Sequence, residues 1–218
     1  MLDGGNVVGG RDRVIVCEKV FSENPGWAES ELIRRLGQLF EVGEMIVIPT
    51  EPGDVVGHAD GVVRFGDGDV VLVNDYRNVD ARYQTALRRV LKRAGLEVIE
   101  LPYSPKAGKA RGIPSASGCY INYLRVGRLI ILPCFGLTED GVAQGIVRQY
   151  FPAGDLSSLD CSDLSAEGGV LNCVSWTLRG SPLTGPDKTG TGTLKTRSQY
   201  RSCQGLLGAR GWCQGTFK

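Results

Sequence analysis

The chain contains a single histidine, His58, which stands in the short glycine-flanked stretch 57–61. Histidine is the side chain whose ordinary titration range places proton exchange near neutral pH, so imidazole chemistry in this protein depends on this one residue. Asp60 follows two positions later. Residues i and i+2 of an extended segment point to the same side. We therefore predict that His58 and Asp60 line one pocket.

Seven cysteines are spread along the chain, at positions 17, 119, 134, 161, 173, 203 and 213. No two of them have C-x-x-C spacing, and an odd number favours reduced thiols over a disulfide framework or a zinc ribbon. With one histidine in the sequence, a His-rich metal site is excluded. Most of these cysteines are expected to be small buried hydrophobic residues. We expect neither a metal nor a cofactor.

The composition is that of an ordinary globular domain, with 218 residues, 42% of them hydrophobic, and a net charge of +1. The small net charge argues against a strongly electrostatic role on nucleic acid or on an anionic membrane. No apolar run approaches the roughly 20 residues that a membrane span needs. The N-terminus shows no signal-peptide pattern. The expectation is a soluble cytoplasmic protein with no nucleic-acid or membrane partner.

Hydrophobic periodicity predicts a strand–strand–helix–strand unit in the middle of the chain. Strands are predicted over 62–65 and 70–74, on either side of a turn over 66–69 that has the composition of a hairpin loop. A helix follows from about Asp80, with Leu87, Val90 and Leu91 on its apolar face, and Gly95 is typical of its C-terminal end. A third strand is predicted over 97–101.

The same order of elements recurs, with a spacing close to ~60 residues. The next copy is predicted as strands over 119–124 and 129–132, a helix over 139–150 that Thr138 caps, and a strand over 155–159. An earlier partial copy is predicted as a strand over 13–20, a helix over 28–40 and a strand over 45–48. A fourth copy is expected to begin over 170–178. The chain is therefore predicted to be an α/β protein of repeated ββαβ units.

The polar candidates occupy similar places in this repeat, at or just before the first strand of a unit. Units packed around a common axis would bring these segments together and build one cleft from distant parts of the chain. The last residues, 181–218, break the pattern, because they are rich in Gly, Ser and Thr and basic in charge. We predict a folded domain over 1–180 and a disordered tail over 181–218.

Four short motifs occur in an order that is similar to the agmatine deiminase and Porphyromonas-type peptidylarginine deiminase family. They are Leu2-Asp3-Gly4-Gly5-Asn6, Gly57-His58-Ala59-Asp60-Gly61 with Val63-Arg64-Phe65, Tyr120-Ile121-Asn122-Tyr123, and Gly168-Gly169 leading to Cys173. The resemblance covers roughly residues 1–179. It implies the pentein fold, in which five ββαβ units form a pseudo-fivefold propeller around a central active site.

The resemblance also implies roles for individual residues. Cys173 would be the nucleophile that attacks the central carbon of a guanidinium. His58 would protonate the departing ammonia and then activate a water, and Asp3 would pair with it. Asp60 would accept hydrogen bonds from the planar guanidinium, with Asn172 and Arg64 as further substrate-binding residues. The implied substrate is agmatine, within putrescine biosynthesis, or the arginine side chain of a peptide.

The match departs from the family in three places. The chain begins at the Asp3 motif, whereas family members carry a long preceding segment, so we expect an N-terminally truncated, partial propeller whose exposed faces leave self-association open. Asn172 stands before the nucleophile, where many relatives have histidine. The sequence after Arg179 does not resemble the family.

Two alternatives remain, a non-catalytic guanidine-binding or interaction module and a related amidinotransferase with an amine acceptor in place of water.

Overall fold

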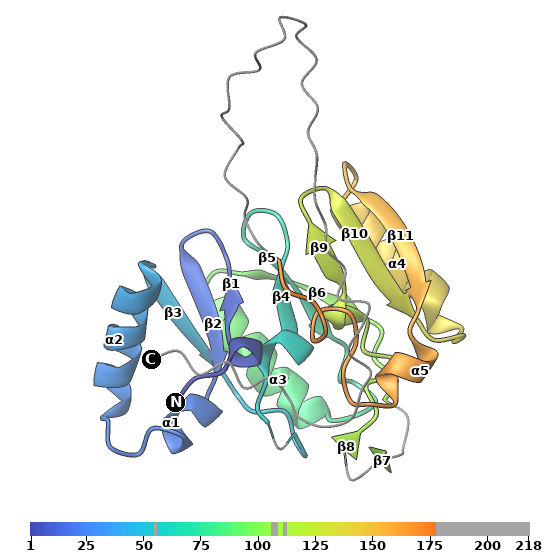
Figure 1. The fold of residues 1–218 in the computed structure, drawn as a ribbon. Coiled ribbons are helices and arrows are strands. Elements are labelled where there is room, and N and C mark those ends of the chain that lie inside the picture. The colour runs from blue at the N-terminus through green and yellow to red at the C-terminus, as the bar shows by residue number, and fades with distance from the viewer. Residues whose placement is uncertain (55, 106–108, 111–112, 178–218) are drawn as a thin grey trace, which may run out of the picture. The chain divides into compact units, whose positions relative to one another are not determined.

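The computed structural model describes residues 1–54, 56–105, 109–110 and 113–177, and everything below concerns these residues. They contain three sheets of three strands, each built from one ββαβ unit (Figure 1). In each unit the first strand runs antiparallel to the second, and a helix then returns the chain to a third strand parallel to the second. The predicted ββαβ repeat is confirmed.

The first unit lies at the left of Figure 1. It consists of the 3₁₀ turn η1 (Gly4–Asn6), β1 (Val8–Gly9), β2 (Arg13–Cys17), α1 (Lys19–Ser22), α2 (Glu29–Phe40) and β3 (Glu44–Ile48). Two predictions need correction here. The strand expected over 13–20 ends at Cys17, where α1 follows. The unit is also a complete ββαβ copy, because the two-residue strand β1 pairs with β2.

The second unit occupies the centre of the described residues. It consists of the 3₁₀ turn η2 (Ala59–Gly61), β4 (Val63–Phe65), β5 (Val70–Asn74), α3 (Ala81–Arg93) and β6 (Glu97–Leu101). The side chains of Tyr83, Leu87 and Leu91, four residues apart, form the buried stripe of α3. The Asp80 carboxylate caps the helix by accepting from the Tyr83 N–H at 2.8 Å. Gly95, with φ of +71°, lies just beyond the helix end, as its sequence position indicated.

The third unit follows a small hairpin of β7 (Lys109–Ala110) and β8 (Ile113–Pro114). It consists of the 3₁₀ turn η3 (Tyr120–Asn122), β9 (Leu124–Val126), β10 (Leu129–Cys134), α4 (Glu139–Tyr150) and β11 (Asp155–Asp160), with α5 (Ser162–Ser165) after it. The strand predicted over 119–124 is thus mostly a buried turn. The fourth unit's predicted first strand is also absent over 170–177, where the chain forms a turn, and residue 178 lies outside the described part.

The start of α4 also differs from the prediction. Thr138 makes no side-chain cap hydrogen bond. Asp140, the second residue of α4, instead holds the loop before the helix, since its carboxylate accepts from the backbone N–H groups of Phe135 and Leu137 and from the hydroxyl of Tyr120. The buried face of the helix is centred on Ala143 and Val147.

Strand β5 explains how the units are held together, because both of its faces are buried. Val71 and Val73 pack into a core shared with Ile15 of the first sheet, whereas Leu72 packs into a core shared with Ile130 of the third. A continuous apolar run is typical of a strand buried on both faces. A separate cluster buries the outer face of β2 against α2.

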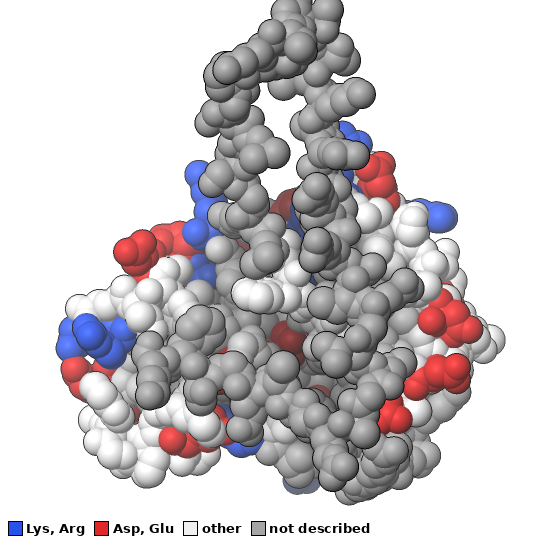
Figure 2. All heavy atoms as spheres, in the orientation of Figure 1, with Lys and Arg blue, Asp and Glu red and all other residues white. Residues whose placement is uncertain are grey.

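Residues Met1–Trp176 form one compact unit. The tail predicted over 181–218 lies outside the described residues, so that prediction and the proposed domain boundary remain predictions. Every helix in the described part is too short or too polar to cross a membrane. On the face shown in Figure 2, acidic side chains gather along the edge that β11 and α5 form, where Asp155, Asp160 and Asp163 are exposed.

Candidate active site

Each ββαβ unit opens with a 3₁₀ turn that ends two residues before the first strand. The N-terminal cap positions of the three turns are Asp3, His58 and Cys119, which therefore occupy equivalent places in the repeat. Turn η1 contacts η2, and η2 contacts η3. The repeat thus brings residues that are more than a hundred positions apart in the sequence to neighbouring turns at one end of the sheets.

Asp3 and His58 form an ion pair, with 3.1 Å between Oδ1 and Nε2. The same oxygen of Asp3 accepts from the backbone N–H of Asn6, which fixes the carboxylate on the turn η1. The imidazole packs against Gly5, where an added Cβ would lie 2.4 Å from Nδ1. The His58 side chain is 31% exposed and the Asp3 side chain is 44% exposed, so a solute can reach the pair.

Asp60 lies beside this pair and is 7% exposed. Its Oδ2 accepts from the side-chain amide of Asn172 at 2.7 Å. Its Oδ1 is buried and has no hydrogen-bond partner among the described residues. Burial raises the pKa of Asp60, against the lowering effect of His58, the Asn172 hydrogen bond and Arg64. A buried carboxylate oxygen without a donor can receive the N–H group of a bound cation.

Cys173 lies in the turn that follows Gly168 and Gly169, and it is the exposed thiol among the described cysteines. Although the residue as a whole is exposed, its sulfur lies 3.2 Å from the side-chain amide nitrogen of Asn122, and a Cβ added at Gly169 would lie 3.5 Å from it. Desolvation by burial, with the negative charge of Asp60, raises the pKa of the thiol. The Val170 backbone, Asn122 and Arg64 act in the opposite direction.

Arg64 projects from β4 with its guanidinium 5.0 Å from the ring centroid of Tyr123. This cation–π contact holds a positive charge beside the site. Its charge lowers the pKa of both Asp60 and Cys173. All six residues singled out from the sequence therefore fall into one neighbourhood. Asp3 contacts His58, Asn172 contacts Asp60 and adjoins Cys173, and Arg64 acts on the Asp60 and Cys173 charges.

One residue of this neighbourhood was missed as a functional candidate. Asn122, in η3, is 2% exposed and contacts both the backbone and the sulfur of the Cys173 turn. The sequence signal that could have identified it is its position in the repeat, because Asn122 stands two residues before the first strand of its unit, as Asn6 does in the first unit. Within the described residues, no group of three or more His, Cys, Asp or Glu side chains is arranged to hold a metal ion.

Comparison with known proteins shows what the chain is similar to. The sequence model of the Porphyromonas-type peptidyl-arginine deiminase family matches residues 1–178. A putative agmatine deiminase of Streptomyces coelicolor is 29% identical over 192 residues, covering 79% of this chain and 56% of the relative. An agmatine deiminase of Pseudomonas aeruginosa is 26% identical over 206 residues, covering 80% and 56%. The chain thus spans little more than half the length of these relatives.

Solved structures show the same fold. The agmatine deiminase of C. jejuni superposes with a TM-score of 0.69 at 19% identity, covering 79% of this chain and 54% of the other. A putative arginine deiminase of Porphyromonas gingivalis superposes with a TM-score of 0.66 at 23% identity, covering 78% and 55%. The described units are therefore part of a pentein fold.

Proposed function

The chain belongs to the Porphyromonas-type peptidyl-arginine deiminase family, and from this we propose that its site hydrolyses a guanidinium group to a ureido group and ammonia. The observation that carries the proposal is the exposed Cys173 thiol beside Asp60, whose buried Oδ1 lacks a donor among the residues that the structure describes. A planar cation bound to that oxygen would present its central carbon near the sulfur. The Asp3–His58 pair supplies the proton chemistry that hydrolysis needs.

The first half-reaction forms a covalent intermediate. The thiolate of Cys173 attacks the guanidinium carbon, and the resulting tetrahedral centre collapses by breaking one C–N bond. His58 gives its proton to the departing nitrogen, which leaves as ammonia, and an amidino group remains on the sulfur. In the free site, Asp60 and burial favour the neutral thiol. A bound cation offsets the charge of Asp60, so substrate binding itself favours the thiolate.

The second half-reaction returns the cysteine. His58, now neutral, takes a proton from a water molecule as the water oxygen attacks the amidino carbon. Breaking the C–S bond releases the ureido product and the thiolate. Asp3 orients the imidazole in both steps, since it holds Nε2 from a carboxylate that is itself fixed on η1.

Arg64 and Asn172 were predicted to bind substrate, and the electrostatics divide their roles. Asn172 donates to Asp60 and so holds the carboxylate that the guanidinium would contact. The guanidinium of Arg64 carries the same charge as the substrate and would repel it at close range. We therefore assign Arg64 to stabilising the Cys173 thiolate, which its charge favours.

Agmatine is the substrate to test first, because relatives that match 79% and 80% of this chain carry the agmatine deiminase name. Its ureido product would place the reaction in putrescine biosynthesis. A peptidyl arginine is the second candidate, since the matching family model carries that name. Either substrate has the same reacting group, and the two differ in what surrounds the far end of the alkyl chain.

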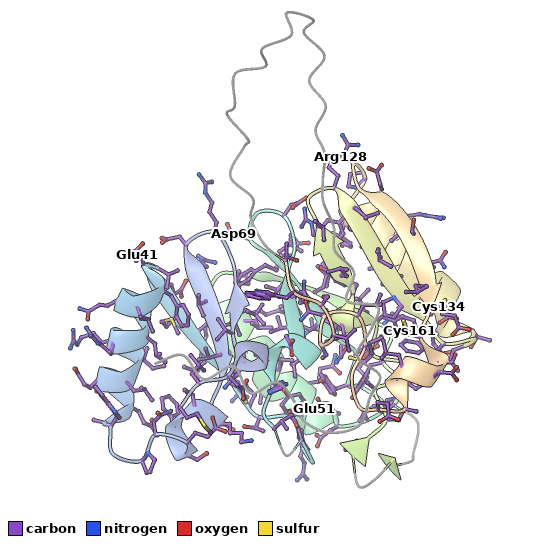
Figure 3. The ribbon with its side chains drawn as sticks, viewed as in Figure 1. Glu41, Glu51, Asp69, Arg128, Cys134 and Cys161 are labelled. Atoms are coloured by element: carbon purple, nitrogen blue, oxygen red, sulfur yellow. The ribbon has the colours of Figure 1, made fainter. Side chains whose placement is uncertain are left out.

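The test is ammonia release from agmatine and from a blocked arginine peptide, with the ureido product measured in parallel. Cys173→Ser should abolish release. Cys134→Ser is the matched control, because it removes a thiol at the end of β10, labelled in Figure 3, whose charged neighbours are Asp140 and Asp160. Equal ammonia from the wild-type protein and from Cys173→Ser would refute the assigned nucleophile.

The ammonia assay, combined with two further measurements, separates the two alternatives. A protein that releases no ammonia but whose melting temperature rises with agmatine is a guanidine-binding module. A protein that transfers the amidino group to added glycine or ornithine, with no free ammonia, is an amidinotransferase. The amidino-transfer product differs by mass from the ureido compound, so chromatography distinguishes the two enzymes, and the melting temperature identifies the binding module.

A further inference from the structure

Asn122 contacts the Cys173 turn through both ends of its side-chain amide. The carbonyl oxygen Oδ1 accepts from the backbone N–H groups of Asn172 at 3.1 Å and Cys173 at 3.2 Å. The amide nitrogen Nδ2 lies 3.2 Å from the sulfur of Cys173. The backbone carbonyl of Asn122 also accepts from the Asn172 N–H at 3.1 Å. One buried residue therefore touches the main chain and the reactive atom of the nucleophile.

The orientation of this amide follows from its partners. Two backbone N–H groups are donors only, so the atom that faces them must be the oxygen. The nitrogen is then left facing the sulfur, with an N–H directed at it. Reversing the amide would place its N–H groups against the two backbone N–H groups and its oxygen against the sulfur. Because the side chain is only 2% exposed, solvent could not satisfy the mispaired groups.

The equivalent residue of the first unit shows that this arrangement is specific to the third. Asn6 stands at the same position relative to its strand, and its Oδ1 accepts from the backbone N–H of Cys17 at 2.6 Å. Its Nδ2, however, donates to the backbone carbonyl of Cys17 at 3.5 Å, so both contacts of Asn6 fall on one backbone. Only in the third unit does the corresponding N–H face a thiol.

We propose that Asn122 is a positioning residue for the nucleophile, whose carbonyl oxygen holds the Cys173 turn and whose N–H stabilises the Cys173 thiolate. This inference rests on the proposed function. Hydrogen bonds to an ionised acceptor are roughly twice as strong as those between neutral groups. The N–H therefore favours the thiolate over the thiol, opposite to burial and to the charge of Asp60. No step of the reaction requires Asn122 to exchange a proton.

The test measures the pH dependence of Cys173 alkylation by iodoacetamide, with the modified peptide quantified by mass spectrometry in the full chain. Asn122→Ala removes both contacts. Asn122→Asp keeps an oxygen for the two backbone N–H groups but replaces the donor with an anion. We expect the alkylation profile to shift to higher pH in both variants, more in Asn122→Asp, with a rate at pH 7 about tenfold lower in Asn122→Ala.

Asn6→Ala is the matched control, since it removes the corresponding buried amide away from the thiol. It should leave the Cys173 profile unchanged. A folded Asn122→Ala or Asn122→Asp variant with the wild-type profile would overturn the proposal. A shift in Asn122→Ala but none in Asn122→Asp would reduce Asn122 to a holder of the turn and overturn its action on the thiolate.

Alkylation requires no turnover, so this result is independent of the deiminase assay. If the wild-type protein releases no ammonia and the profile still shifts in the variants, the proposed function fails and the role of Asn122 stands. If the wild-type protein is active and the profiles coincide, the role of Asn122 fails alone. Should Asn122→Ala not fold, Asn122→Asp carries the test, because it retains the acceptor for both N–H groups.

Discussion

Two carboxyl groups, those of Asp60 and Glu51, lie in surroundings that disfavour their charge, and burial is the largest cause of the raised pKa in both. At Asp60, the charges of His58 and Arg64 and the hydrogen bond from Asn172 offset part of the effect of burial on the pKa. Glu51, labelled in Figure 3, accepts from the Tyr103 hydroxyl at 2.9 Å but has the negative charge of Asp54 nearby. Burial and that charge raise the pKa of Glu51 to about 7.

Glu51 should therefore make the protein less stable as pH rises. The folded state holds this proton more tightly than the unfolded chain, where the pKa is near 4.5. The free energy of unfolding should fall between pH 4.5 and about 7 and then level off, with a total loss on the order of 2 kcal/mol for this partly buried group. Glu51→Gln stays neutral and should lose this decline, as urea unfolding at several pH values would show.

The Gln side chain keeps an oxygen for the Tyr103 hydroxyl, so the variant isolates the charge. Glu29→Gln, on the exposed first turn of α2, is the control and should keep the wild-type pH dependence. If Glu51→Gln loses stability between pH 5 and 7 as steeply as the wild type, then Glu51 does not carry the effect.

At the scale of elements, the turn η1 must approach the imidazole closely. Gly5→Ala would place a Cβ 2.4 Å from Nδ1 of His58, whereas a Cβ on Gly4 meets nothing within 4 Å. The imidazole would have to rotate away from Asp3. A displacement of about 1 Å at a reacting group can cost on the order of a hundredfold in rate. We expect a fall of this size in kcat for Gly5→Ala and little change for Gly4→Ala.

A second pair of variants separates a working helix cap from a nominal one. Asp80 caps α3 through the Tyr83 N–H, and Asp80→Ala should lower the free energy of unfolding by about 1 kcal/mol. Thr138 precedes α4 but caps no backbone group through its side chain. Thr138→Ala should change stability by no more than about 0.5 kcal/mol. Thermal and urea unfolding of the two variants measure the difference, and equal losses would contradict this assignment.

The sequence predicted the elements whose pattern is long or strongly periodic. The buried strand β5 and the helix α3, whose buried stripe has residues spaced four positions apart, are such elements. Strand β1 was missed because two residues show no alternation. The stretch 119–124 alternates as a strand does, but Tyr120–Asn122 forms a buried 3₁₀ turn, because sequence alternation alone does not fix the local backbone geometry. The role of Asp140 was not predicted because its carboxylate binds the loop before α4 and not the helix itself.

The site was predictable to the extent that the repeat was. The equivalent positions of Asp3 and His58 follow from the units, and the structure joins them in an ion pair. The catalytic roles proposed for Asp3, His58 and Cys173 came from resemblance, because spacing alone does not distinguish a nucleophile from a buried thiol. Asn122 stood in one of the four motifs but was assigned no role, because its partners lie fifty positions away, in a turn whose backbone donors no sequence pattern reveals.

At the scale of the molecule, the three units share their cores and should unfold together. Strand β5 contributes Val71 and Val73 to the core with the first unit and Leu72 to the core with the third. The first unit also has the cluster between β2 and α2, but its other core, like that of the third unit, is shared with β5. Through these shared cores, β5 connects the first unit, which carries the Asp3 turn, to the core next to the Cys173 turn, although the two turns lie far apart in the sequence.

Leu87→Ala tests this coupling. Leu87 lies on α3, is fully buried and packs in the core between the first two sheets, so truncation should cost about 2–5 kcal/mol. Native-state hydrogen exchange should report the same loss for the amides of β2, β5 and β10, because opening one unit exposes the core of the next. Leu39→Ala, on α2 with its side chain 71% exposed, is the control and should change none of them. Slower-exchanging β10 amides that keep their wild-type protection in Leu87→Ala would mean that the third unit opens independently, and the site would then be assembled from separately folding parts.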